Sequence, residues 1–99
     1  MEKIHILVVD DHTLFRRGLI ALLSQAQDFE VIGEAGDAIE AIRLCKTLKP
    51  DVILLDNHLP GASGIQSLPD IFHASPESTV MMLTVSEDEG DLIQALQNG

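Results

Sequence analysis

The segment Asp51–Asp56 constrains the fold more than any other stretch of this chain. Its sequence, DVILLD, places four consecutive apolar residues between two aspartates. A strand with one face in water alternates apolar and polar residues, whereas a strand covered on both faces is continuously apolar. The segment therefore predicts a central strand of a parallel sheet that carries helices on both faces.

Strand-like and helical segments alternate along the rest of the chain. Strands are expected at Ile4–Asp10, Glu30–Ala35, Asp51–Asp56 and Thr79–Val85. Helices are expected at Thr13–Gln25, from the cap Asp37 to the stop at Lys49–Pro50, at Gly64–Ala74, and from the cap Ser86 to the stop signal Asn98–Gly99. Short connections in this βαβαβαβα order predict one α/β domain, a doubly wound parallel sheet with right-handed crossovers.

The first two helices carry apolar faces at helical spacing. Asp37 is expected to cap the second helix, with Glu40 as the reciprocal half of a capping box. Pro69 is expected to interrupt the third helix or to mark a late start. The expected faces are Leu14, Phe15, Leu19, Leu22 and Leu23 in the first helix, with Arg16 and Arg17 off the face, and Ile39, Ile42, Cys45 and Leu48 in the second.

Composition and charge exclude several classes of function. The chain has 99 residues, and 45% of them are hydrophobic, which is enough for one domain with a real core. Its formal net charge of -10 argues against binding to nucleic acid or to an anionic membrane, because both need clustered Lys and Arg. The single cysteine, Cys45, is expected in the core. No run is long enough for a signal peptide or a membrane span, so we expect a cytoplasmic protein.

Three acidic residues fall where strands end. Asp10 and Asp11 close the first strand, and Asp56 closes the third. Thr84 sits at the corresponding end of the fourth strand. In an open parallel sheet, the ligand site lies outside these carboxyl ends. The side chains therefore converge if the first and third strands are neighbours, which the sequence permits but does not prove.

Such crowding of carboxylates predicts a metal ion. Two carboxylates about 4 Å apart repel by roughly 4 kcal/mol at an effective dielectric constant of about 20. Three of them will not stay ionised and dry without a compensating cation. Oxygen ligands suit Mg²⁺, which commonly binds one or two carboxylates together with a phosphate of its substrate, and Mn²⁺ is also accepted.

A carboxylate beside a divalent ion can attack phosphorus and form an aspartyl phosphate. Asp56 is the better nucleophile because it stands alone on its strand, which leaves Asp10 and Asp11 to hold the metal. The Thr84 hydroxyl can donate a hydrogen bond to a phosphoryl oxygen. Taken singly, each aspartate is more often a helix cap or a structural residue, but the combination on successive strands favours a site.

These motifs resemble the receiver domain of bacterial two-component response regulators. The resemblance runs from about Ile4 to Gly99 and rests on ILVVDDH, DVILLDNHLPGASG and VMMLTVSEDEGDLIQALQNG; GEAGDAIEAIRLCKTLKPDVILLD is especially similar to the nitrate-response, LuxR/FixJ-type subfamily. It implies a flavodoxin-like fold with strand order 2-1-3-4-5. It also implies phosphotransfer from a sensor histidine kinase and a regulatory role rather than that of an enzyme.

The resemblance also implies roles for individual residues. Asp56 matches the phosphoacceptor, Asp11 the direct metal ligand, and Asp10 the acidic neighbour that reaches the ion through water. The remaining matches are the metal-binding backbone carbonyl of His58, the switch hydroxyl of Thr84 and the turn Pro60–Gly61. Asn57 and Ser86 are expected beside the site. His12 follows the acidic pair, and a histidine on the surface at a helix start is the favoured interpretation.

The chain departs from the family pattern at its end. It stops at Gly99, before the family's fifth strand, its phosphate-pairing lysine and its fifth helix. We therefore expect residues 1–99 to be an incomplete receiver domain with a DNA-binding output domain downstream, and we expect self-association through the fourth strand and fourth helix. A phosphorylation-incompetent interaction module is the alternative. A phosphatase of the haloacid-dehalogenase type ranks low, because His58 stands where that family has a second Asp.

Overall fold

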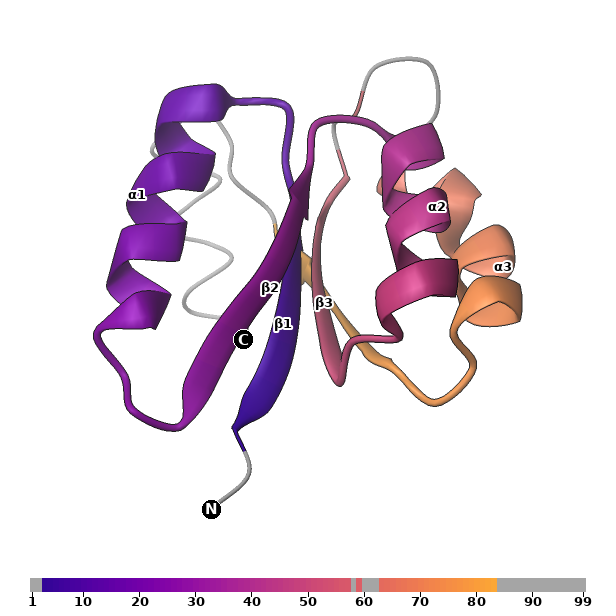
Figure 1. The fold of residues 1–99 in the computed structure, drawn as a ribbon. Helices are drawn as coiled ribbons and strands as arrows, with labels where there is room; N and C mark the ends of the chain where they lie inside the picture. Colours follow the sequence, from indigo (N-terminus) through magenta and orange to yellow (C-terminus); the bar gives the residue numbers. More distant parts are fainter. Residues whose placement is uncertain (1–2, 58, 60–62, 84–99) are drawn as a thin grey trace, which may run out of the picture.

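The computed structural model describes residues 3–57, 59 and 63–83, which form a four-stranded parallel sheet between helices (Figure 1). The strands are β1 (Ile4–Val9), β2 (Phe29–Ala35), β3 (Val52–Asp56) and β4 (Thr79–Leu83), and the helices are α1 (Thr13–Ser24), α2 (Ala38–Leu48) and α3 (Gly64–Ala74). Figure 1 shows α1 on one face of the sheet and α2 with α3 on the other. No helix in this part of the chain is long and apolar enough to cross a membrane.

The strand order is β2-β1-β3-β4, and every neighbouring pair is parallel. This arrangement confirms the predicted doubly wound α/β fold with order 2-1-3-4. The expected helix that begins at Ser86 and the last two residues of the expected fourth strand lie outside the described residues. Adjacency of β1 and β3 is the feature that the candidate site requires, since both strands point their carboxyl ends to the same edge.

Alternate residues of the central strands fill two separate cores. Leu7 and Val9 of β1 pack with residues of α2 and α3, while Ile6 and Val8 pack on the α1 side. All four are buried, as is Cys45 of α2, whose thiol pKa burial raises to about 11. The continuous apolar runs therefore reflect coverage on both faces, as predicted, and Cys45 is confirmed as a core residue.

The predicted apolar face of α1 is partly wrong. Leu14 and Leu22 are 89% and 67% exposed, whereas Leu19, Ile20 and Leu23 pack against the sheet. At about 100° per residue, the packed side of the helix is centred between Leu19 and Ile20 and also includes Arg16, which was placed off the face. Leucine content suggested the wrong rotation of the helix, because a leucine on the surface costs little.

The predicted apolar face of α2 is wrong at Ile39, whereas Cys45 is buried and Ile42 packs against the core. Ile39 is 82% exposed, and the buried residues are Ala38, Ala41 and Cys45. The Asp37 side chain accepts from the Glu40 backbone N–H at 2.8 Å, so the predicted cap is present. The reciprocal half of the box is not, because the Glu40 carboxylate instead binds Arg43 at 2.5 and 3.0 Å.

Helix α3 is continuous through Pro69, so the predicted interruption or late start is wrong. A complete capping box fixes its beginning: Gln66 N–H donates to Ser63 Oγ at 3.1 Å, and Ser63 N–H donates to Gln66 Oε1 at 3.0 Å. After the capping box, the buried residues Ser67 and Ile71 pack the helix against the rest of the domain. The cap and this burial offset the backbone hydrogen bond that Pro69 cannot make.

The first residue of α3 packs directly on the end of β3. Gly64 N–H donates to the Asn57 carbonyl at 3.0 Å. A Cβ at Gly64 would lie 2.6 Å from the Asp56 carbonyl oxygen and 3.1 Å from the Asn57 Cα. Because both atoms belong to the backbone, neither can move aside cheaply. Gly64 therefore sets how closely α3 approaches the strand that carries Asp56.

We expect Gly64→Ala to lower the free energy of unfolding by about 1–3 kcal/mol, the usual cost of overpacking a close contact. Gly18→Ala is the matched control, because a Cβ there meets no described atom within 4 Å on exposed α1. It should raise stability by about 1 kcal/mol, since alanine is the better helix former. Urea unfolding followed by circular dichroism measures both. Equal stability of Gly64→Ala and the parent would show that α3 can retreat without cost.

Candidate functional site

The pairing of β1 with β3 brings two carboxylates to one edge of the sheet. Val9 pairs with Leu55, so Asp10 and Asp56, the next residues, reach the edge at the same level. Their backbones are fixed by the sheet: Asp10 N–H donates to the Ala35 carbonyl at 3.0 Å, and Asp56 pairs with Leu83 of β4. Asp10 is fully buried and Asp56 is 1% exposed.

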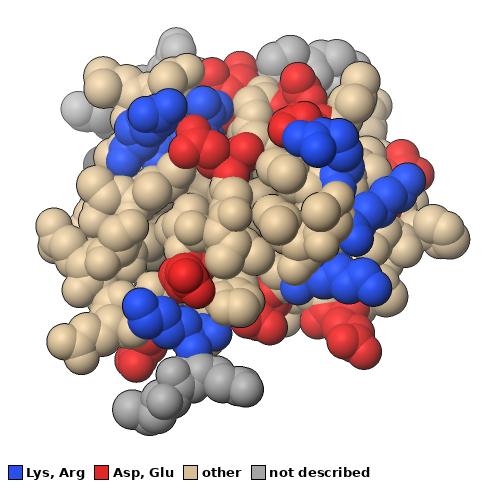
Figure 2. All heavy atoms as spheres, in the orientation of Figure 1, with Lys and Arg blue, Asp and Glu red and all other residues tan. Residues whose placement is uncertain are grey.

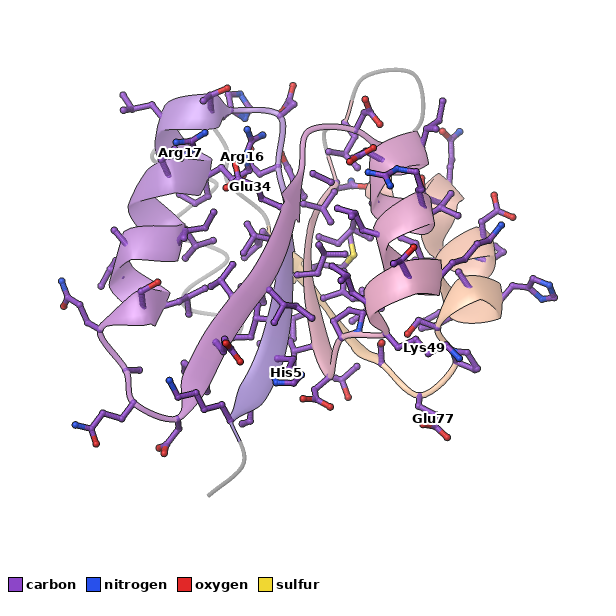
Figure 3. The ribbon with its side chains drawn as sticks, viewed as in Figure 1. His5, Arg16, Arg17, Glu34, Lys49 and Glu77 are labelled. Atoms are coloured by element: carbon purple, nitrogen blue, oxygen red, sulfur yellow. The ribbon has the colours of Figure 1, made fainter. Side chains whose placement is uncertain are left out.

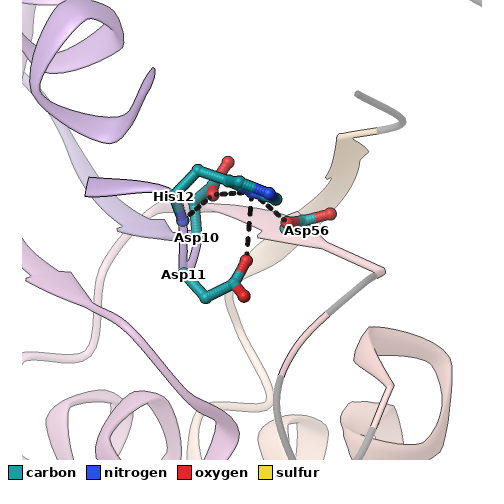
Figure 4. Close-up of side chains that lie close together, drawn as sticks. All are labelled: Asp10, Asp11, His12 and Asp56. Atoms are coloured by element: carbon teal, nitrogen blue, oxygen red, sulfur yellow. Dashed lines mark hydrogen bonds and ion pairs between the residues drawn. The ribbon is translucent and has the colours of Figure 1, made fainter. Parts of the chain in front are cut away.

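Four side chains meet at this edge (Figure 4). Asp10, Asp11, His12 and Asp56 each offer one ligand atom, and these atoms all lie within 4.8 Å of one another. The carboxylate of Asp11 is 31% exposed, so the cluster opens to solvent on that side. The convergence expected from neighbouring strands is thus present for the three aspartates, with a histidine in addition.

The His12 imidazole lies among the carboxylates. Its Nδ1 is 3.2 Å from Asp10 Oδ1, 3.1 Å from Asp11 Oδ1 and 3.8 Å from Asp56 Oδ2. The hydrogen bond to Asp10 and then the negative charge of Asp11 raise the pKa of His12 above its ordinary value. His12 lies exposed at the start of α1, as expected, but it also contacts the acidic pair, which was not the favoured interpretation. The His12 backbone N–H donates to Asp10 Oδ1 at 2.7 Å, and this turn carries the ring back over the acidic pair.

The donor set fits a hard divalent cation. Asp10 Oδ2 is buried and has no hydrogen-bond partner among the described residues, although a buried carboxylate oxygen without a donor is costly. Carboxylate oxygens are the ligands that Mg²⁺ and Mn²⁺ take in proteins. If these oxygens bound a cation, that cation would compete with the His12 ring for their lone pairs.

Other residues expected at the site have mixed outcomes. Asn57 supports the beginning of α3, because its Oδ1 accepts from Ile65 N–H at 3.2 Å and its carbonyl accepts from Gly64. This contact gives Asn57 a local structural role beside Asp56. The remaining expected residues, His58, Pro60, Gly61, Thr84 and Ser86, lie outside the described residues.

Arg16 is a neighbour of the site that sequence reasoning missed. Its Nη1 donates to the Asp10 carbonyl at 2.6 Å, and its Nε donates to Glu34 Oε1 at 2.9 Å. Figure 3 shows Arg16, Arg17 and Glu34 close together where α1 faces β2. The spacing of three, four and seven residues from Arg16 to Leu19, Ile20 and Leu23 was the available signal, since it places Arg16 on the packed side of the helix.

The chain is similar to known proteins over almost its whole length. Residues 6–99 match the family model of the response regulator receiver domain. The chain is 38% identical over 98 residues to the nitrate/nitrite response regulator protein NarL of Escherichia coli and 34% identical over 98 residues to the transcriptional regulatory protein DegU of Brevibacillus brevis. Both matches include 99% of this chain but only 45% and 42% of the other two proteins. The chain therefore spans less than half of their length.

A solved structure is similar over the whole chain. The signal receiver domain of NarL from Mycobacterium tuberculosis superposes with a TM-score of 0.80 at 36% identity, covering 100% of this chain and 80% of the other.

We expect millimolar Mg²⁺ to raise the melting temperature of the chain, because a ligand that binds only the folded state stabilises it. Asp11→Ala should abolish this response, since it removes the most accessible of the three carboxylates. Asp70→Asn removes an exposed acidic residue of α3 and should leave the response unchanged. Differential scanning calorimetry with and without MgCl₂ measures the effect. An undiminished response in Asp11→Ala would place the cation elsewhere.

Proposed function

Because the chain belongs to the response regulator receiver domain family, we propose that it is a phosphoacceptor switch that takes a phosphoryl group on Asp56. The observation that carries this proposal is the convergence of Asp56 with Asp10 and Asp11 at the carboxyl ends of β1 and β3. Asp56 is buried and rigidly held by a central strand, so its carboxylate is presented in a fixed direction. Such preorganisation favours nucleophilic attack.

The phosphoryl donor is the phosphohistidine of a sensor kinase. An oxygen of the Asp56 carboxylate attacks phosphorus, and the new O–P bond forms as the P–N bond to the kinase histidine breaks. The bonding electron pair stays on the departing imidazole nitrogen, which takes up a proton. The product is an acyl phosphate on Asp56, which water can hydrolyse to return the carboxylate.

Asp10, Asp11 and Asp56 are the residues that would hold a divalent cation, with Mg²⁺ as the expected ion and Mn²⁺ as an accepted substitute. When bound, such an ion neutralises negative charge on the transferring phosphoryl group. The family resemblance adds the backbone carbonyl of His58 as a further ligand and the hydroxyl of Thr84 as the donor to the phosphoryl group. These two assignments rest on the resemblance alone.

In this proposal, the phosphorylation state of Asp56 regulates transcription. The matched relatives are a nitrate/nitrite response regulator and a transcriptional regulatory protein, and both are more than twice as long as this chain. A DNA-binding domain elsewhere in the full protein would read the state of Asp56. Direct nucleic-acid binding by this segment is not proposed, because its net charge is -10 and Figure 2 shows basic side chains beside acidic ones on the face in view.

A second candidate function is a self-associating interaction module. Met81 and Met82 of β4 are 56% and 36% exposed, and β4 lies at one end of the described sheet. Exposed apolar side chains on a strand with open backbone groups favour pairing with another chain. Light scattering on the purified chain tests this candidate, and a monomer at high micromolar concentration would argue against it.

We expect incubation with acetyl phosphate and MgCl₂ to add the mass of one phosphoryl group, as measured by intact-protein mass spectrometry. Hydroxylamine should remove the added mass, because it cleaves acyl phosphates and leaves phosphoserine intact. Asp56→Asn should lose the adduct. Asp51→Asn is the matched control, since Asp51 immediately precedes β3, at the opposite end from Asp56, and its side chain accepts from His5 N–H at 2.8 Å.

A parent protein that stays unmodified would favour the interaction module. An adduct that persists in Asp56→Asn would move the phosphoacceptor to another residue.

A further inference from the structure

Arg16 connects the candidate site to two other segments of the chain. One guanidinium nitrogen, Nη1, donates to the Asp10 carbonyl at 2.6 Å, and another, Nε, donates to Glu34 Oε1 of β2 at 2.9 Å. The side chain is only 13% exposed, so these bonds lie largely out of water. Figure 3 shows Arg16 and Glu34 meeting at the end of the sheet from which the acidic pair emerges.

The carbonyl that Arg16 binds controls the path of the acidic pair. Asp10 is held on its other side by the hydrogen bond from its N–H to the Ala35 carbonyl at 3.0 Å. Because a peptide group is planar, fixing the Asp10 carbonyl also fixes the direction of the following N–H and Cα, which belong to Asp11. Asp11 has no strand of its own, so Arg16 supplies the restraint that a sheet supplies to Asp56.

We propose that Arg16 is a positioning residue for the cation site: it holds the Asp10–Asp11 peptide so that both carboxylates face the same point as Asp56. The proposal rests on the proposed function, because it assumes that these three carboxylates bind a divalent ion.

The surroundings of Arg16 suit this role. Gly36 leaves room for the guanidinium, since a Cβ there would lie 3.3 Å from Arg16 Nη1. Glu34 orients the group through Nε, which leaves Nη1 directed at the Asp10 carbonyl. Arginine can make both bonds at once from a rigid planar group, whereas a lysine ammonium sits on a flexible stem and lacks that fixed geometry.

If Arg16 acted only through its charge, its replacement would change the affinity for Mg²⁺ in the opposite direction. A positive charge near three carboxylates repels an incoming divalent cation, so its removal alone would tighten metal binding. Removal of a positioning contact would instead weaken binding, because the oxygens would no longer be held together. The direction of the change in Kd for Mg²⁺ therefore distinguishes the two roles.

Arg17 provides a matched control within the same helix. Its Nε lies 3.4 Å from the same Glu34 Oε1, and its side chain is 68% exposed. The contacts of the described residues give Arg16, not Arg17, the bond to the Asp10 carbonyl. The two arginines thus share a charge and a carboxylate partner but differ in the contact that the proposal requires.

The test compares Arg16→Gln, Arg16→Lys and Arg17→Gln by isothermal titration with MgCl₂. Outer contacts of metal ligands typically contribute about 10–100-fold to affinity, so both Arg16 variants should weaken Kd by about tenfold or more. Arg17→Gln should change Kd by less than about twofold, because its exposed charge is screened by salt. Since Arg16→Lys keeps the charge, its weakening would exclude a purely electrostatic cause.

Amide spectra of the metal-free ¹⁵N-labelled protein give a second readout. The Asp11 and His12 amides should shift or broaden in both Arg16 variants and stay in place in Arg17→Gln. Unchanged amides, or a folded Arg16→Gln that binds Mg²⁺ as tightly as the parent or more tightly, would overturn the proposal.

The experiment also distinguishes a parent that does not bind Mg²⁺ from a variant that does not fold. If the parent itself does not bind Mg²⁺, the metal part of the proposed function fails, and the amide spectra alone decide whether Arg16 positions the acidic pair. If Arg16→Gln does not fold, Arg16→Lys and Glu34→Ala carry the comparison, and the latter should displace the same amides because it removes the acceptor that orients the guanidinium.

Discussion

Mutual repulsion between Asp10, Asp11 and Asp56 is the constraint on which the rest of the site depends. Parallel pairing of β1 with β3 leaves Asp10 and Asp56 no means of separating, because both are held by the sheet as they leave it. Each close pair of carboxylates costs a few kcal/mol, on the order of 4 at an intermediate dielectric constant. His12 and its hydrogen bonds offset part of this cost, and a divalent cation would offset more.

The central sheet could be predicted from sequence because its signal is simple. Residues buried on both faces must be apolar, and short connections leave few topologies for four parallel strands. The helices were harder, because each covers only one face of the sheet. Exposed Leu14, Leu22 and Ile39 show that apolar residues also occur on the surface, so spacing alone gave the wrong rotation of α1 and misplaced Ile39 of α2. The predicted interruption of α3 at Pro69 was wrong for a related reason. Proline destabilises a helix interior, but this local effect takes no account of the capping box at Ser63.

The residues of the candidate site also differ in how well the sequence predicts their positions. Asp10 and Asp56 were predictable as positions, because a strand end fixes where a short side chain lies. Contacts of longer side chains are harder to predict, so the sequence placed His12 at the surface without its contacts to the carboxylates and left Arg16 off the packed side of α1. Their contacts depend on the turn after β1 and on the rotation of α1, which are tertiary features. Strand ends thus indicate where the carboxylates lie, whereas the groups that orient them depend on the packing of α1 and on the turn after β1.

The contact between Gly64 and the Asp56 carbonyl also limits how this sequence can diverge. A glycine fits there because it has no Cβ, and every other residue would push the helix away from the strand. Substitutions at an exposed position such as Gly18 therefore cost this chain little, while a side chain at position 64 lowers stability unless the β3–α3 junction changes at the same time. An evolutionary change of that kind needs coordinated steps, so the spacing between Asp56 and α3 should be inherited as a unit.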